Sequence, residues 1–140
     1  MTKIVIHKGY GGFNLSYKLI MRYAKLAMFN VYAYKCDYKS DYKNCEYIKL
    51  TEDEINYIDQ DEIYYLYNNE NVVTSEDSDD LYLQSIDRSD CRLIMALEEM
   101  PDEMEKCELK IVEIPDAVDW YIEEDDSGYE WIAERHRTWS

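Results

Sequence analysis

Apolar residues recur along this chain at two spacings, one typical of helices and the other typical of strands. A spacing of three and four residues covers residues 15–27 and 91–100, and it predicts the two main helices. Thr51 and Glu54 have the spacing of a capping box, so we expect a short helix over residues 52–57. Alternating or β-branched runs predict strands, which the sequence places at residues 3–8, 31–36, 45–50, 81–86 and 109–114.

Three further segments complete the predicted fold. The aromatic run 62–67 fits either a helix or a strand, and its tyrosines favour a strand. Polar residues 68–80 predict a solvated, mobile loop. Residues 119–124 and 129–136 flank a polar turn in which Gly128 can take a left-handed conformation, which predicts a β-hairpin. The whole pattern predicts a single α+β domain over residues 1–140, with a mixed β-sheet, two main helices and a C-terminal hairpin.

A glycine-rich turn follows the first predicted strand. Glycine tolerates positive φ, so this density of glycines favours a structural turn that lets strand and helix pack closely. The alternative is a small anionic-ligand site built from backbone N–H groups and C-terminal arginines. The spacing matches neither a Walker loop nor GxGxxG. The residues of this alternative site are Gly9, Tyr10, Gly11, Gly12, Arg135 and Arg137.

Charge is distributed very unevenly along the chain. Residues 1–50 carry a net charge of +6 and residues 51–140 a net charge of −22, which gives −16 overall. Between Lys49 and Arg88 the chain has twelve acidic residues and no basic residue. Direct nucleic-acid binding is therefore disfavoured, because phosphate neutralisation requires Lys and Arg. A basic partner is the natural complement of this charge, and the alternative is that the acids serve solubility alone.

Tyrosine is abundant beside the acidic tract. Its ring gives a large contact area and its hydroxyl a polar tip, which suits protein interfaces. The alternative is that low-GC coding enriches Tyr, Asn, Lys and Ile together. The interface interpretation predicts a partner-binding surface made of Glu52, Asp53, Glu54, Asp59, Asp61, Glu62, Tyr64, Tyr65, Tyr67, Glu76, Asp77, Asp79 and Asp80.

No motif with catalytic mechanics stands out. His7 and His136 offer acid–base chemistry, but no nucleophile motif such as GxSxG accompanies them. The four cysteines form no CxxC pair, and we expect free thiols rather than a metal site or a disulfide framework. We therefore predict a protein that is not an enzyme and that binds neither a cofactor nor a metal. The sequence has no apolar run of membrane-spanning length and no signal peptide, so we expect a cytoplasmic protein.

Two blocks of sequence resemble a family of small, acidic, uncharacterised bacteriophage proteins. The blocks are IVIHKGYGGFNLS (residues 4–16) and LKIVEIPDAVDWYIEEDDSGYEWIAERHRTW (residues 109–139). A weaker match is DRSDCRLIMALEE (residues 87–99), where relatives tend to have proline at the position of Cys91. Residues 31–80 do not follow the family pattern, so we interpret them as an insertion particular to this chain. The resemblance implies a phage origin and no catalytic residues, cofactor or ligand.

Phage genomes encode small acidic proteins that disable host machinery, among them DNA mimics and CRISPR antagonists. The resemblance and the charge together predict a phage-encoded protein that inhibits or modulates a host nucleic-acid-handling protein, such as a CRISPR effector, by phosphate mimicry. The expected partner is a basic host protein in the cytoplasm of an infected bacterium, with no direct contact to nucleic acid or membrane. The alternatives are the small anionic-ligand binder and an enzyme of unknown type.

Overall fold

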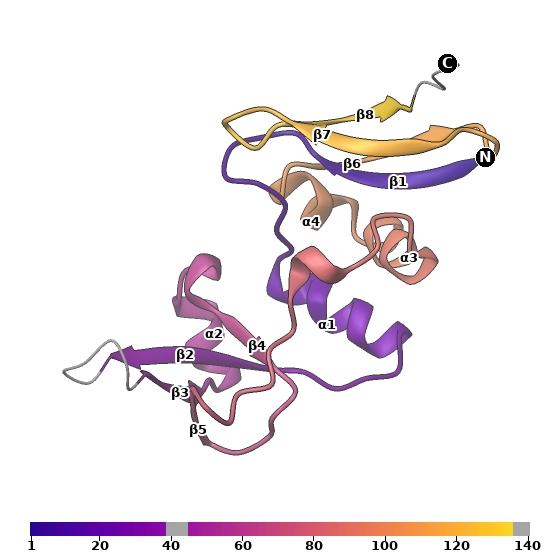
Figure 1. Ribbon diagram of the computed structural model, residues 1–140. Coiled ribbons are helices and arrows are strands. Elements are labelled where there is room, and N and C mark those ends of the chain that lie inside the picture. The colour runs from indigo at the N-terminus through magenta and orange to yellow at the C-terminus, as the bar shows by residue number, and fades with distance from the viewer. Residues whose placement is uncertain (39–44, 136–140) are drawn as a thin grey trace. The chain divides into compact units, whose positions relative to one another are not determined.

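The computed structural model describes residues 1–38 and 45–135, and it has the α+β fold that the sequence predicts (Figure 1). The chain divides into two compact units. Unit 1 consists of Met1–Tyr23 and Leu83–Ser140, and unit 2 consists of Ala24–Tyr82. Unit 2 therefore interrupts unit 1 in sequence. It contains the whole of residues 31–80, the segment interpreted above as an insertion.

Unit 1 contains two antiparallel strand pairs and most of the helical residues. Its elements are β1 (Thr2–His7), α1 (Tyr17–Leu26, of which the last three residues belong to unit 2), η2 (Leu83–Ser85), α3 (Cys91–Glu99), α4 (Pro101–Lys106), β6 (Leu109–Ile114), β7 (Trp120–Glu124) and β8 (Glu130–Glu134). β1 pairs with β6, with Thr2 opposite Ile114 and His7 opposite Leu109. β7 and β8 form the predicted C-terminal hairpin.

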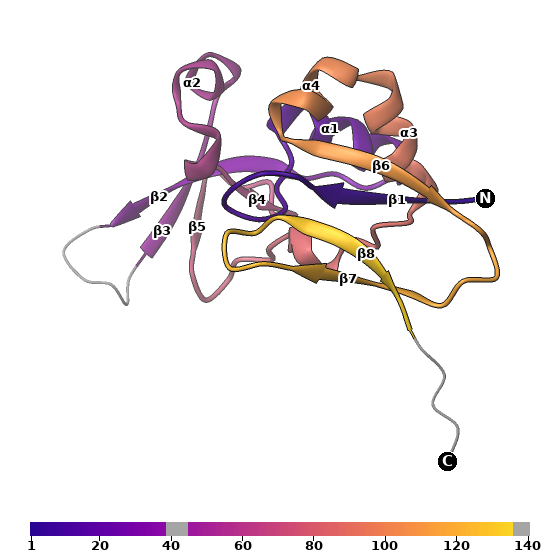
Figure 2. The ribbon, with the colours of Figure 1, turned by 90° about the horizontal axis from the view of Figure 1, so that it is seen from above.

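The core of unit 1 lies between the strand pair β1–β6 and the helices (Figures 1 and 2). Ile4, Val5 and Ile6 of β1 are fully buried. The two longest helices bury apolar residues at helical spacing, which confirms the predicted main helices, and each buried Leu or Ile contributes roughly 1.5–3 kcal/mol. The buried helical residues are Leu19, Ile20, Tyr23, Leu93, Ile94, Ala96 and Leu97.

A buried ion pair joins distant parts of unit 1. Arg88 Nη1 donates to Glu130 Oε1 (2.7 Å) and Arg88 Nη2 donates to Glu130 Oε2 (3.0 Å), so the pair is bidentate. Only 5% of the Glu130 side chain and 16% of the Arg88 side chain are exposed. The guanidinium also lies 3.6 Å from the centre of the Phe13 ring. Removing one partner of a buried pair leaves an uncompensated charge, which costs about 3–5 kcal/mol.

The same two residues also hydrogen-bond to main-chain groups of β1 on the edge that faces away from β6. The Val5 N–H donates to the Arg88 carbonyl (2.9 Å), and the Arg88 guanidinium donates to the Val5 carbonyl (3.2 Å). The His7 N–H donates to Glu130 Oε1 (2.7 Å). β8 runs beside β1 along this edge (Figure 2). The Glu130 carboxylate and both the guanidinium and the main-chain carbonyl of Arg88 therefore hydrogen-bond to this edge of β1.

The glycine turn packs against the tip of the hairpin. The Gly11 N–H donates to the Ser127 carbonyl (3.0 Å). Gly11, Gly12 and Gly128 all have positive φ (+91°, +82° and +94°). A Cβ at Gly128 would lie 2.5 Å from the Gly12 nitrogen, whereas a Cβ at Gly11 would meet no atom within 4 Å. The sequence predicted close packing of strand and helix at this turn. The close approach in the structure is instead between the turn and the hairpin, and it depends most on Gly128.

We expect Gly128→Ala to destabilise the protein more than Gly11→Ala does. Both substitutions impose positive φ on a residue with a Cβ, which costs more than about 1 kcal/mol. Only the alanine at position 128 also clashes with a backbone atom that cannot rotate away. Urea unfolding of the two variants measures the difference. Equal midpoints would show that the contact between the turn and the hairpin does not constrain the backbone.

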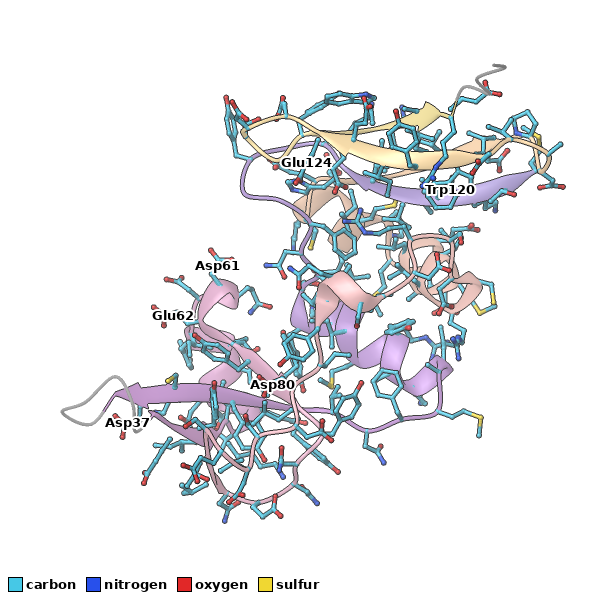
Figure 3. The ribbon with its side chains drawn as sticks, viewed as in Figure 1. Asp37, Asp61, Glu62, Asp80, Trp120 and Glu124 are labelled. Carbon is cyan, nitrogen blue, oxygen red and sulfur yellow. The ribbon has the colours of Figure 1, made fainter. Side chains whose placement is uncertain are left out.

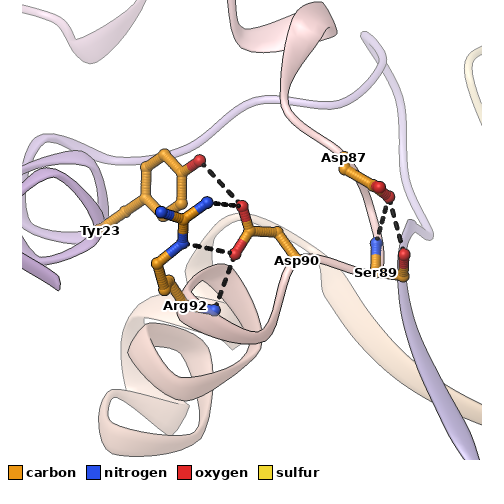
Figure 4. A network of polar contacts seen from close by, with 5 residues as sticks. All are labelled: Tyr23, Asp87, Ser89, Asp90 and Arg92. Carbon is orange, nitrogen blue, oxygen red and sulfur yellow. Dashed lines mark hydrogen bonds and ion pairs between the residues drawn. The ribbon is translucent and has the colours of Figure 1, made fainter. Parts of the chain in front are cut away.

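A polar network caps the start of α3 (Figure 4). The N-cap residue Asp90 accepts hydrogen bonds from the Arg92 N–H (2.8 Å) and from Arg92 Nη2 (2.8 Å). The Tyr23 hydroxyl donates to the same carboxylate (3.3 Å). The hydrogen bond from the Arg92 side chain is the main reason that the pKa of Asp90 lies below its usual value. Asp87 accepts from Ser89 and orders the preceding turn.

This network predicts a pH-dependent stability. Because the folded-state pKa of Asp90 is depressed, its charge stabilises the fold above about pH 3.9, the usual Asp pKa, and this contribution is lost as pH falls through the folded pKa. We expect Asp90→Ala to lower the free energy of unfolding at pH 7 by about 1–2 kcal/mol, because the N-cap is lost. Asp90→Asn retains a capping oxygen and should cost less.

Urea unfolding at pH 7 and pH 3 separates the two effects. The difference between the wild type and Asp90→Asn should shrink at pH 3, because that pH lies below the usual Asp pKa, which applies to the unfolded chain. A difference that stays constant over this pH range would exclude a contribution from the Asp90 charge.

Unit 2 is built on a four-stranded antiparallel sheet with the order β4-β2-β3-β5. Its elements are β2 (Tyr32–Tyr38), β3 (Cys45–Lys49), α2 (Glu52–Tyr57), η1 (Gln60–Glu62), β4 (Tyr64–Leu66) and β5 (Val72–Thr74). Tyr34, Leu66 and Val73 form its buried centre. The single hydroxyl proton of Tyr34 is shared between the carbonyls of Asn68 (3.0 Å) and Glu70 (2.6 Å), and burial raises the pKa of this hydroxyl. This one side chain ties the 68–70 segment to the sheet.

Several sequence predictions are wrong in detail. Residues 68–80 are not a simple loop, because they contain β5, and Asp80 forms a β-bridge with Leu66. Residues 81–86 form no strand, because the chain leaves the sheet after Leu81 and turns into η2. Cys91 and Cys107 are free, as expected, whereas Cys36 is disulfide-bonded.

Candidate functional site

An acidic hollow lies on unit 2, beside α2 and η1. Its volume is about 470 Å³. Four carboxylates and one amine line it together with apolar and aromatic side chains. The lining residues are Lys35, Leu50, Asp53, Glu54, Tyr57, Ile58, Asp59 and Glu62. We call this feature the acidic hollow.

The capping box fixes the α2 side of the hollow. The Glu54 N–H donates to the Thr51 hydroxyl (3.3 Å), and Glu54 Oε1 accepts from the Thr51 hydroxyl (3.1 Å) and from its N–H (3.4 Å). These bonds confirm the predicted short helix. The hydrogen bond from the Thr51 side chain is the largest cause of the lowered pKa of Glu54, and Lys35 adds to it. Glu54 therefore stays charged at neutral pH.

Buried Ile55 anchors α2 and leaves the opposite side of the helix exposed. Tyr57 follows Ile55 by two residues, or about 200° around the helix, and its side chain is 91% exposed. After α2 the chain turns into η1, where Asp59 is the N-cap but makes no side-chain capping bond. Tyr57 belongs to the hollow but was missed from the sequence, although its offset from Ile55 was a usable signal.

The hollow has an excess of negative charge. Lys35 Nζ lies 3.5 Å from Glu54 Oε2, so the single amine balances one carboxylate. Asp53, Asp59 and Glu62 are exposed, and among the described residues no basic side chain other than this lysine lines the hollow with them. Opposite charge is attracted to such a concavity, where field lines converge. A lysine or arginine side chain of a partner is therefore the ligand that this arrangement suits.

The structure brings together only part of the predicted acidic surface. Asp53, Glu54, Asp59 and Glu62 share the hollow, while Glu52 and Asp61 are exposed nearby on α2 and η1 (Figure 3). The second acidic group, which follows β5, does not line the hollow. In that group Asp77 accepts a hydrogen bond from the Thr74 hydroxyl (3.1 Å), and Asp80 is half-buried. The residues of the second group are Glu76, Asp77, Asp79 and Asp80.

The predicted tyrosines divide by exposure. Tyr64 and Tyr67 are exposed, and Tyr64 packs against Tyr47 with ring centres 5.3 Å apart. Tyr65 is only 7% exposed and belongs to the core of unit 2. Tyr65 therefore does not belong to the exposed surface that the sequence predicted. Its neighbour Leu66 is also buried, so both faces of β4 are covered at this point.

The glycine turn borders a second hollow, on unit 1. It has a volume of about 440 Å³ and is lined by Gly11, Gly12, Phe13, Gln84, Arg88, Ile122, Glu124 and Glu130. Within the described part of the chain, its one cationic lining residue is Arg88, which is already paired with Glu130, and Glu124 adds a further negative charge. These charges disfavour an anion. Tyr10 is exposed beside the turn, and Gly9 lies against the Glu108 side chain.

The structure does not bring Arg135 to the glycine turn. Its N–H donates to the Asp119 carbonyl (2.9 Å), at the end of the hairpin opposite Gly128. Five residues of strand separate the two ends, which corresponds to roughly 16 Å. Arg137 and His136 lie outside the described residues. Among the residues described, the anion site expected from the sequence therefore lacks its arginine.

Comparison with known proteins adds no further assignment: no family model, curated protein or solved structure matches the chain. Within residues 1–38 and 45–135, no helix is long and apolar enough to cross a membrane. The same part of the chain holds no group of three or more His, Cys, Asp or Glu side chains arranged around a metal position.

Proposed function

We propose that this protein is a phage-encoded acidic binding protein that inhibits or modulates a host nucleic-acid-handling protein. Its acidic hollow takes a basic side chain of that partner, and the surrounding carboxylates stand in for phosphates. A defence nuclease such as a CRISPR effector is one partner of this kind. The site of action is the cytoplasm of an infected bacterium, and the role is binding rather than catalysis.

One observation carries the proposal: Asp53, Glu54, Asp59 and Glu62 line the same hollow, and Lys35, the amine that lines it with them, pairs with Glu54. Exposed carboxylates scattered over a surface would serve solubility equally well. Carboxylates that converge on one concavity repel one another, and a cation bound there relieves the repulsion. The phage origin is supported by the sequence resemblance, which covers segments of unit 1.

Exposed Tyr57 adds an aromatic ring to the rim of the hollow. A guanidinium or ammonium group is attracted to an aromatic face as well as to carboxylates. Surfaces of nucleic-acid-handling proteins that grip phosphates are rich in such groups. The proposed partner surface is therefore one that normally binds DNA or RNA.

Removing negative charge from the acidic hollow should strongly reduce the capture of a partner protein. Tagged full-length protein is used to capture proteins from bacterial lysates at salt concentrations from about 50 mM to about 500 mM, and double-stranded DNA is then added as a competitor. We expect captured proteins to be released by DNA and by salt. Asp59→Asn/Glu62→Gln should reduce their capture at least about tenfold, because every 1.4 kcal/mol of lost binding free energy is a factor of ten.

A matched control separates the site from net charge. Asp102→Asn/Glu105→Gln removes the same number of charges from exposed positions of α4. This control should change capture less than twofold. Equal losses of capture from both variants would show that capture depends on overall charge alone. Captured proteins that added DNA does not release would contradict phosphate mimicry.

A further inference from the structure

The β7–β8 hairpin has two chemically different faces. Glu130 is buried, and Figure 3 shows Trp120 and Glu124 on the side of the hairpin toward β1. Because side chains alternate along strands, the odd-numbered residues lie on the other face. Glu123 stands opposite Trp131, and Tyr121 stands opposite Ala133. We call this second face the outer face of the hairpin.

A carboxylate is fixed between two aromatic side chains on the outer face. Glu123 Oε1 accepts from the Tyr121 hydroxyl (2.8 Å), and Glu123 Oε2 accepts from Trp131 Nε1 (2.9 Å). The ionised carboxylate has about four acceptor positions, so each oxygen retains capacity for another donor. The Trp131 side chain is nevertheless 40% exposed. The arrangement presents a held anion beside an accessible indole ring.

Two basic side chains of this chain already lie over rings of the hairpin, one of them on the outer face. Arg135 Cζ lies 5.5 Å from the centre of the Tyr121 ring, and Lys8 Nζ lies 5.8 Å from the centre of the Tyr129 ring. Both distances are within the range of cation–π attraction. Rings of the hairpin therefore already attract cationic groups of the chain itself.

The charge of the hairpin has the sign that such a ligand requires. Residues 119–134 contain seven acidic residues and no lysine or arginine. Arginine fits better than lysine, because its planar guanidinium stacks on an indole ring and donates to a carboxylate at the same time. Lysine is a compact point charge that gains less from a ring and a fixed carboxylate together.

We infer that the outer face, through Trp131 and Glu123, binds an arginine-bearing segment of a partner protein. The guanidinium stacks on the exposed indole and donates to the free acceptor positions of Glu123. This surface lies on unit 1 and does not depend on the acidic hollow of unit 2. Experiments can therefore contradict the proposal for one of these two sites and leave the other proposal standing.

The experiment titrates full-length protein with a hexa-arginine peptide and with a hexalysine peptide and follows the Trp131 indole N–H signal by NMR. We expect saturable movement of this signal, with hexa-arginine binding at least fivefold more tightly than hexalysine. Glu123→Gln should weaken the hexa-arginine titration at least fivefold. Asp126→Asn removes one charge from an exposed position of the same hairpin and should change the affinity less than twofold.

Three outcomes would overturn the inference. The first is a Trp131 indole signal that stays in place while either peptide binds elsewhere on the protein. The second is equal weakening by Glu123→Gln and Asp126→Asn, which would show that binding depends on net charge alone. The third concerns the acidic hollow. Asp59→Asn/Glu62→Gln should leave the titration of the indole signal within twofold. A large loss from that variant would place the cation on the acidic hollow instead.

Discussion

The bidentate pair between Arg88 and Glu130 is the interaction on which the organisation of unit 1 depends. It neutralises two largely buried charges, and it also supplies hydrogen bonds to the edge of β1 that faces away from β6. Arg88 follows closely after unit 2 in the chain, and Glu130 opens the last strand of the hairpin. The pair therefore forms only when three distant segments have come together, and breaking it exposes all three.

Contacts between its two sequence segments explain how unit 1 can fold although unit 2 lies between these segments in the chain. Loop-closure entropy grows slowly with length, so a 59-residue segment between Tyr23 and Leu83 adds little cost once the closing contacts are strong. Unit 2 has its own sheet and its own buried centre around Tyr34. Its exposed acids are therefore free to serve recognition, because the stability of neither core rests on Asp59 or Glu62.

Most helices and strands could be predicted from local patterns in the sequence. The features that could not be predicted depend on pairing between residues far apart in the chain. The faces of α1 and α3, the Thr51–Glu54 capping box and the C-terminal hairpin all follow from spacings of a few residues, and they were predicted. The burial of Glu130 was not predicted, because Arg88, which neutralises its charge, lies 42 residues away in the sequence. The direction of Tyr65 was also missed, since aromatic residues at 64, 65 and 67 occupy both faces of β4 and the alternation cannot show which face is inward. Four of the ten predicted acids line the hollow. Asp79 and Asp80 lie elsewhere, because the Tyr67 N–H donates to the Asp79 carbonyl and Asp80 forms a bridge with Leu66, a pairing that local patterns do not reveal.

The central claim is that unit 2 recognises a basic partner through the hollow beside α2 and η1. Amide hydrogen exchange, measured on the full-length protein alone and bound to a DNA-displaceable partner, tests it most directly. The account predicts slower exchange in residues 52–62 on binding, because a side chain seated in the hollow suppresses local opening of both short helices. Unchanged exchange throughout 52–62, with protection confined to other parts of the chain, would contradict it.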